Sequence, residues 1–438
     1  MQVDKTTLQD ISIFHTDETQ SVFYYLNRTK TNGGREHLRR ILSNPLNSIA
    51  AIEDVQKTIK QLLEVHHLLP ATITNGTIMV IESFFETATD SYPTHPNALN
   101  SLTYKIISAA DFSITKYSTT HFVGFIKDLV QIESILSNKN DSKLIQSWCE
   151  LINTLIKRPL LQTVLQWPRD KKMSNTEILW LGAYLKQHFK QQTLKLIDLC
   201  NRLDAYISMA MVSKEHSLTF PRFNASPEPL IRAKGLYHLL LKVPICYDII
   251  LDKTTNFMFL TGANMAGKST FIKSVGTSIY LAHIGMGVPA SDMELSLFEG
   301  LLTNIQVEDH IAKGESYFFN EVKRIKRTVE KISDGRRWLI LIDELFKGTN
   351  VQDAMKCSIT VIEGLHKINN ALFILSTHLY EIAEPLQKYQ NIDFRYFETR
   401  AESDQLVFSY QLQKGVSNDR IGYLILKREG VVEMLARL

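Results

Sequence analysis

The stretch TGANMAGKST, residues 261–270, decides the fold of the C-terminal half of the chain. It has the spacing G-x-x-x-x-G-K-[ST], with Gly262, Gly267, Lys268 and Ser269 at the four required positions. The apolar run NFMFL just before it predicts a buried strand, and the sequence after it predicts a helix. In this context backbone N–H groups and the helix N-terminus surround phosphates. A plain glycine-containing turn is the alternative, and the strand–loop–helix context favours phosphate binding.

The residue types inside this stretch predict an ATP·Mg²⁺ site. Lys268 is expected to reach the β and γ phosphates, and the Ser269 hydroxyl is expected to bind Mg²⁺. The nine residues expected to contact the nucleotide are Gly262, Ala263, Asn264, Met265, Ala266, Gly267, Lys268, Ser269 and Thr270.

A second apolar run, in RRWLILIDELFKGTN (residues 336–350), ends in two carboxylates. Asp343 at the strand tip suits Mg²⁺, directly or through water. Glu344 is expected to orient and polarise the attacking water. An acidic pair after an apolar strand can equally begin a solvated loop. The phosphate loop in the same chain favours the catalytic interpretation.

A third apolar run, NALFILSTH, ends in Thr377 and His378. A histidine just past a strand end can sense the γ-phosphate or hold the water. A partly exposed loop histidine is the alternative. Because α/β proteins bind ligands at the carboxyl ends of parallel strands, a catalytic role for His378 is favoured.

Composition indicates an ordinary soluble protein with two or more domains, since the 438 residues are 44% hydrophobic and 22% charged. No apolar run of about 18 residues predicts a membrane span, and the polar N-terminus has no signal-peptide pattern. The four cysteines are far apart, which favours a reduced, cytoplasmic location. The net charge of +3 neither requires nor excludes nucleic acid as a partner.

The periodicity of apolar residues divides the chain near residue 222. Residues 1–222 space their apolar residues by three and four, which predicts an all-α domain. Residues 223–438 alternate strand candidates (256–260, 338–342 and 371–375) with helices, which predicts a mostly parallel α/β domain with a P-loop NTPase fold.

These motifs resemble those of the MutS family of DNA mismatch-repair ATPases. TGANMAGKST is similar to T-G-P-N-M-G-G-K-S-T, with Ala263 in place of proline and Ala266 in place of glycine. LILIDELFKGTN resembles L-x-x-I-D-E-x-x-x-G-T-[ST], and STHL resembles A-T-H-[YF]. In DHIAKGESYFFNEVKRI, Ser316 and Glu321 match the S-T-F-x-x-E-M segment, and Tyr317 departs from its usual threonine.

The resemblance extends to weaker blocks at residues 203–213, 235–241 and 415–430, and to residues 21–46, which resemble the start of the family's helical core domain. It implies an ABC-type ATPase domain placed C-terminal to a helical core or lever domain. Only 20 residues precede Ser21, so the family's two mismatch-reading domains are expected to be absent. FFE at 84–86 matches the family's Phe-x-Glu wedge by letters only and is predicted to be core plus surface.

The resemblance further implies a homodimer through the ATPase domains, with each nucleotide held between two subunits. Gly314 and Ser316 are then expected to contact the γ-phosphate in the partner's site. A helix N-cap is the alternative role for Ser316, and both roles are compatible because a capped helix N-terminus also attracts anions. Residues 348–350 are expected to form an interface loop. The family's C-terminal dimerisation segment is expected to be truncated.

Two functions remain open from the sequence. The first is a MutS-like ATPase that binds duplex or branched DNA as a nucleotide-gated dimer, without mismatch reading. The second is a regulatory or scaffold ATPase that acts on a protein partner without DNA. Two clusters of basic residues are candidates for contacts with DNA phosphates. Alternatively, they form solvated helix faces. The clusters are Arg28, Lys30, Arg35, Arg39 and Arg40, and Lys157, Arg158, Arg169, Lys171 and Lys172.

Overall fold

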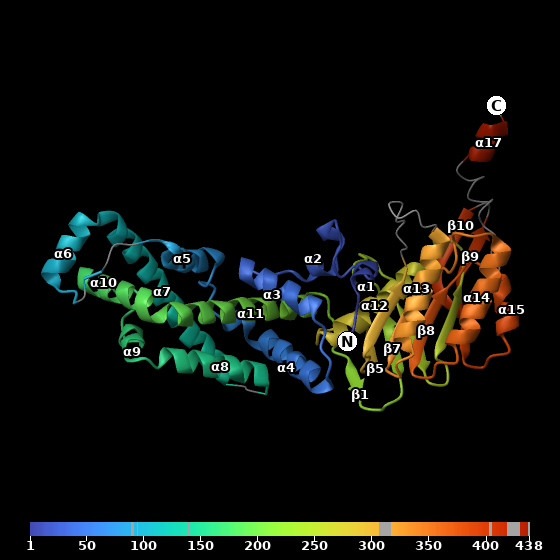
Figure 1. The fold of residues 1–438 in the computed structure, drawn as a ribbon, viewed down its shortest axis with the longest axis horizontal. Helices are drawn as coiled ribbons and strands as arrows, with labels where there is room; N and C mark the ends of the chain where they lie inside the picture. Colours follow the sequence, from blue (N-terminus) through green and yellow to red (C-terminus); the bar gives the residue numbers. More distant parts are fainter. Residues whose placement is uncertain are drawn as a thin grey trace. The chain divides into compact units, whose positions relative to one another are not determined.

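Two compact units make up the computed structural model, which describes residues 1–88, 92–93, 95–138, 141–305, 317–402, 405–417 and 430–436 (Figure 1). One unit contains residues 1–25, 44–53 and 216–438, and the other contains residues 26–43 and 54–215. The N-terminal 25 residues therefore belong to the same unit as the C-terminal half of the chain.

Helices form all the regular structure among the described residues of the unit 26–43 and 54–215. They are α3 (Asn32–Ser43), α4 (Ile49–Val65, which starts in the other unit), η2 (His66–Leu68), α5 (Asn75–Glu86), α6 (Ala98–Ile107), α7 (Ala109–Ser137), α8 (Lys143–Ile156), α9 (Pro159–Leu165), α10 (Asn175–Tyr184), η3 (Leu185–Phe189) and α11 (Lys190–Glu215). The predicted helical character of this half is confirmed. The FFE stretch lies in α5, and both phenylalanines are buried, as predicted for core residues.

A six-stranded sheet, in the order β10-β9-β4-β8-β7-β6, forms the centre of the other unit. Its strands are β4 (Phe257–Thr261), β6 (Gly300–Asn304), β7 (Trp338–Asp343), β8 (Ala371–Ser376), β9 (Ile392–Glu402) and β10 (Gln405–Lys414). All neighbouring pairs are parallel except β9 and β10. The three predicted strands are β4, β8 and β7, and they lie next to each other. Their carboxyl ends therefore share one edge of the sheet.

Helices cover both faces of this sheet because alternate residues of each buried strand point to opposite faces. Phe257, Ile340 and Phe373 share one core cluster with residues of the helices that follow β6, β7 and β8. On the other face, Leu341 approaches Gly276 so closely that a side chain there would not fit. The helices are α12 (Lys268–His283), α13 (Tyr317–Ile332), α14 (Val351–Leu365), η5 (Tyr380–Ile382) and α15 (Ala383–Leu386).

The N-terminal segment extends the edge of the sheet beside β6. Gln2 forms a parallel bridge with Gly300, and α1 contacts β6. The remaining helices among the described residues of this unit are α1 (Lys5–Asp10), η1 (Glu18–Gln20), α2 (Val22–Leu26, which ends in the other unit) and α17 (Val431–Ala436). A separate four-stranded sheet has the order β1-β5-β2-β3, with β1 (Arg222–Asn224), β2 (Leu230–Leu236), β3 (Tyr247–Asp252) and β5 (Asp292–Ser296). No helix among the described residues is long and apolar enough to cross a membrane.

Candidate active site

The loop between β4 and α12 takes a backbone path that requires glycine at two positions. Gly262 has φ +143° and Gly267 has φ +107°, both in the region that side chains avoid. A Cβ at Gly262 would also lie 3.2 Å from Phe397. Ala266 has no positive φ, so alanine at a position where MutS motifs have glycine places no strain on the loop. The two glycines of the motif thus stand at the two loop positions whose backbone conformation requires glycine.

Lys268, the first residue of α12, lies inside this loop. Its side chain is 5% exposed, and its Nζ donates to the carbonyl oxygens of Gly262 at 2.6 Å and Ala263 at 3.0 Å. Burial lowers the pKa of Lys268, and the nearby carboxylates of Glu344 and Asp343 oppose this effect. The loop thus holds a buried ammonium group through two backbone carbonyl oxygens, at the N-terminus of a helix, where an anion is favoured.

Asp343, at the end of β7, is held from two sides by hydroxyl groups. Ser269 Oγ donates to one carboxylate oxygen and Ser376 Oγ, at the end of β8, donates to the other. Asp343 is buried. A carboxylate next to a serine hydroxyl is the hard oxygen donor set that Mg²⁺ prefers. The chemistry of Ser269 and Asp343 therefore fits the metal expected with ATP.

Glu344 follows directly in a strained conformation, with φ +62° and its N–H donating to the Ser376 carbonyl at 3.0 Å. Its Oε1 lies 3.7 Å from His378 Nδ1, and its Oε2 lies 3.1 Å from Lys347 Nζ. The interaction with His378 is the largest cause that lowers the pKa of Glu344 to about 2. Burial opposes this shift, and Lys347 supports it. The carboxylate is therefore ionised at neutral pH and can accept a hydrogen bond from water.

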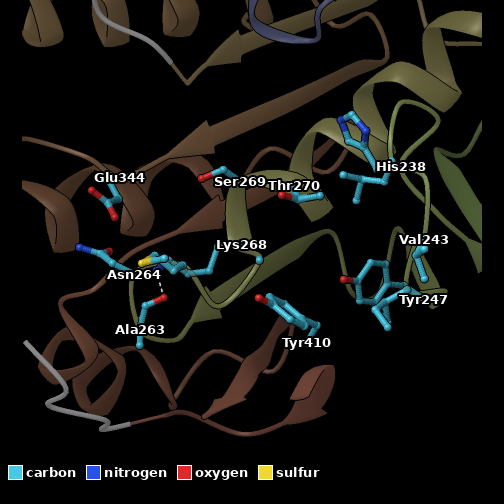
Figure 2. A pocket seen from close by; sticks show the side chains of 14 residues that line it. His238, Val243, Tyr247, Ala263, Asn264, Lys268, Ser269, Thr270, Glu344 and Tyr410 are labelled. Atoms are coloured by element: carbon cyan, nitrogen blue, oxygen red, sulfur yellow. Dashed lines mark hydrogen bonds between the residues drawn. The ribbon is translucent and has the colours of Figure 1, made fainter. Parts of the chain in front are cut away.

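Lys268, Ser269 and Glu344 line one cavity of about 500 Å³ (Figure 2). Figure 2 shows Glu344 and Asn264 toward one side of the loop and His238, Val243 and Tyr247 toward the other. The lining residues are Ala263, Asn264, Met265, Gly267, Lys268, Ser269, Thr270 and Glu344 from the predicted site, and His238, Leu241, Val243, Ile245, Tyr247 and Tyr410 from elsewhere. The predicted polar groups thus meet an apolar, aromatic wall.

Sequence reasoning missed the residues of this aromatic wall. Tyr410 lies in β10 with φ +52°, where the pairing with β9 shifts register. Burial raises the pKa of Tyr247 to about 12 and lowers that of His238 to about 4, so both are neutral at physiological pH. His238 and Leu241 lie in the block 235–241, which resembles the family only weakly and predicts no role for them. Tyr247 in β3 and Tyr410 in β10 lie in no motif that the sequence analysis links to the nucleotide.

Some predicted site residues stand apart from the cavity lining. Gly262 and Ala266 shape the loop without lining the cavity. Asp343 lies behind Ser269, to which it is hydrogen-bonded, and His378 contacts Glu344, and neither lines the cavity. Gly314 and Ser316 lie outside the described residues, so their role in the partner's site stays a prediction. In the expected interface loop, Asn350 caps α14 by accepting a hydrogen bond from the Asp353 N–H, which is a structural role.

Two family models match this chain. MutS domain III matches residues 6–334, and MutS domain V matches residues 258–435. The first model alone covers well over half of the chain. The chain belongs to the MutS family. The family predicted from the motifs is therefore confirmed. The domain III match contains the helical unit, and both matches contain the nucleotide loop.

Several curated MutS proteins are similar to the chain. The DNA mismatch repair protein MutS of Streptococcus sanguinis is 29% identical over 260 residues, which are 58% of this chain and 30% of that protein. The MutS protein of Thermosipho melanesiensis is 28% identical over 289 residues, which are 64% of this chain and 35% of that protein. The aligned part of the chain thus spans about a third of the length of these relatives.

Proposed function

We propose that this MutS family chain is an ABC-type ATPase in which ATP binding and hydrolysis gate a homodimer on duplex or branched DNA, without mismatch reading. One observation carries the ATPase part. Lys268 and Ser269 after β4 and Asp343 and Glu344 after β7 come from two separate segments and meet at the shared carboxyl edge of β4, β7 and β8. This is the edge at which α/β proteins bind ligands.

Each of these residues has one role in the proposed reaction. Lys268 exchanges its carbonyl partners for phosphate oxygens, and the N-terminus of α12 adds its dipole. Ser269 and Asp343 hold Mg²⁺, which neutralises charge on the phosphate oxygens when bound. Glu344 accepts a hydrogen bond from the attacking water, and His378 fixes the carboxylate. The aromatic wall with Tyr247 and Tyr410 suits the flat purine base.

The dimer and the DNA are proposed from the family relationship. The relatives are named DNA mismatch repair proteins, and Gly314 and Ser316 match the family segment expected to contact the partner's nucleotide. A γ-phosphate held from two subunits favours the closed dimer, and hydrolysis removes that preference.

One observation favours the alternative, an ATPase that acts on a protein partner without DNA. Several members of the two basic clusters are already paired within the helical unit. Arg28 lies 3.0 Å from Glu215, Arg169 lies 3.0 Å from Asp128, and Lys171 lies 2.6 Å from Glu177. These pairs weaken the case for phosphate contacts by the same three side chains.

The choice between the two functions requires a DNA-binding measurement. Binding of perfect duplex, single-mismatch duplex and a four-way junction would be compared at one salt concentration with a slowly hydrolysed ATP analogue. We expect binding to duplex or junction, no preference for the mismatch, and loss of the nucleotide effect in Lys268→Ala. No binding to any of the three at low salt would contradict the DNA proposal and favour the protein partner.

A further inference from the structure

Glu321 is a buried carboxylate with no part in the reaction described above. It lies on α13 and is only 2% exposed. Its Oε1 accepts from the Lys347 N–H at 3.2 Å, and its Oε2 accepts from the Gly348 N–H at 3.3 Å. Burying a carboxylate is unfavourable unless its oxygens are satisfied. Both oxygens of Glu321 are satisfied by the backbone of the loop that directly follows Glu344.

The loop that Glu321 binds has an unfavourable backbone. Glu344 has φ +62° and Phe346 has φ +59°, two left-handed residues that are not glycine. Such conformations persist only where the surrounding structure holds them. α13 provides a second support, because the Phe318 ring packs against the Phe346 ring with centroids 5.6 Å apart. α13 thus supplies two contacts to this strained loop, beside the hydrogen bond from the Glu344 N–H to the Ser376 carbonyl.

α13 is itself fixed to the edge of the sheet, one turn after Glu321. Arg324 Nη2 donates to the Thr303 carbonyl at 2.6 Å, at the end of β6. The same nitrogen donates to Asp10 Oδ2 at 3.1 Å, and Asp10 is buried on α1. A helix anchored in this way gives Glu321 a defined position relative to β7 and to Glu344.

We propose that Glu321 is a positioning residue that holds the loop after Glu344 so that the Glu344 carboxylate faces the nucleotide cavity. This inference rests on the proposed ATP hydrolysis. Glu321 binds the backbone N–H of Lys347, and the Nζ of the same lysine lies 3.1 Å from Glu344 Oε2. The contact with Glu321 therefore also positions the Lys347 ammonium group. Glutamine at this position would turn one acceptor into an N–H donor that faces a backbone N–H.

The test compares Glu321→Gln with wild type and with a matched control on the same helix. Glu330→Gln serves as the control because the Glu330 side chain is 62% exposed and its ion pair with Lys326 is long, at 3.9 Å. The kcat and KM of ATP hydrolysis and the affinity for an ATP analogue would be measured. We expect Glu321→Gln to lower kcat at least about tenfold while KM and affinity stay within about twofold, and Glu330→Gln to change neither.

A double-mutant cycle tests whether Glu321 acts through Glu344. In the Glu344→Gln background, Glu321→Gln is expected to lower the residual single-turnover rate by less than about twofold, since there is no catalytic carboxylate left to place. An equal loss in both backgrounds would overturn the proposal, as would a loss of affinity that matches the loss in kcat.

The conservative variant Glu321→Asp keeps the charge on a shorter side chain and decides the matter if Glu321→Gln does not fold. It is expected to show a smaller loss of kcat with KM unchanged, and unchanged kcat would overturn the proposal. If wild type hydrolyses ATP, Glu344→Gln does not, and Glu321→Gln hydrolyses ATP as fast as wild type, the inference about Glu321 is overturned and the proposed function is not. A wild type without ATPase activity would overturn the proposed function together with it.

Discussion

Glu344 combines a left-handed backbone, with φ +62°, with a carboxylate whose pKa is about 2. The hydrogen bond with His378 and the ammonium group of Lys347 favour its charged form. Glu344 thus accepts a hydrogen bond from water throughout the neutral range, and it returns a proton readily because it is a weak base. Glu344 therefore contributes mainly by orienting and polarising the attacking water, and less by removing a proton from it completely.

Glu344→Gln is therefore expected to keep ATP binding and lower hydrolysis by about 10²- to 10⁴-fold, because the amide keeps the shape and loses the negative charge. Single-turnover hydrolysis and equilibrium ATP binding measure the two effects separately. Lys268→Ala is the matched comparison, since it should lose ATP binding itself. Hydrolysis at the native rate in Glu344→Gln would remove Glu344 from its assigned role.

At this scale the sequence predicts residues whose type and spacing carry the chemistry. Lys268, Ser269, Asp343 and Glu344 follow from motifs, and the structure brings them together. Glu321 is marked by a family segment, but its contact with the Lys347 and Gly348 amides could not be predicted, because it depends on how α13 packs. The contact of Ser376 and the aromatic wall could not be predicted either, because they depend on which strands become neighbours and on a register shift in β10. Local sequence does not encode these relations in any readable pattern.

The C-terminal end of α12 is fixed by a buried neutral histidine. His283 is fully buried, with Nδ1 2.8 Å from the Ile279 carbonyl and Nε2 3.0 Å from the Phe298 N–H. The imidazole therefore donates through Nδ1 and accepts through Nε2, which only the neutral ring can do. Burial lowers its pKa from 6.5 to about 4. A pKa that is lower in the folded state gives stability above pH 6.5 that is lost as pH falls toward 4.

His283→Gln is expected to weaken this pH dependence, because a glutamine amide can make both hydrogen bonds and does not titrate. In wild type, His283 contributes a loss of up to about 1.4 kcal/mol of unfolding free energy per pH unit as the pH falls between these values. Urea unfolding of both proteins above and within this range measures the difference. Equal pH slopes in the two proteins would show that His283 is not the titrating group.

The elements themselves were predicted to different degrees. β4, β7 and β8 follow from apolar runs of four or five residues, because central parallel strands are buried on both faces. β9, β10 and the strands of the four-stranded sheet contain no apolar run of four or more residues, and no strand is predicted there from such a run. The bridge between Gln2 and Gly300 joins residues almost 300 positions apart, and no local pattern predicts it.

On the scale of the whole molecule, the proposed mechanism requires two chains for each complete site. Lys268→Ala removes the phosphate contact within a subunit, and Ser316→Ala removes the contact expected in the partner's site. Mixed dimers of the two variants are expected to contain one site with both defects and one intact site, and so to recover up to about half of the activity of wild type per dimer. Steady-state ATPase activity across mixing ratios measures this recovery. Activities that are the plain average of the two variants would argue for sites complete within one chain.

The most direct test of the account is the affinity for DNA of Glu344→Gln in saturating ATP and in saturating ADP, measured by equilibrium titration at one salt concentration. The account predicts that the ATP-bound and ADP-bound proteins differ at least about tenfold in affinity for duplex or junction DNA, because nucleotide and DNA are coupled through the dimer. Equal affinities in the two nucleotide states, or no DNA binding in either, would contradict it.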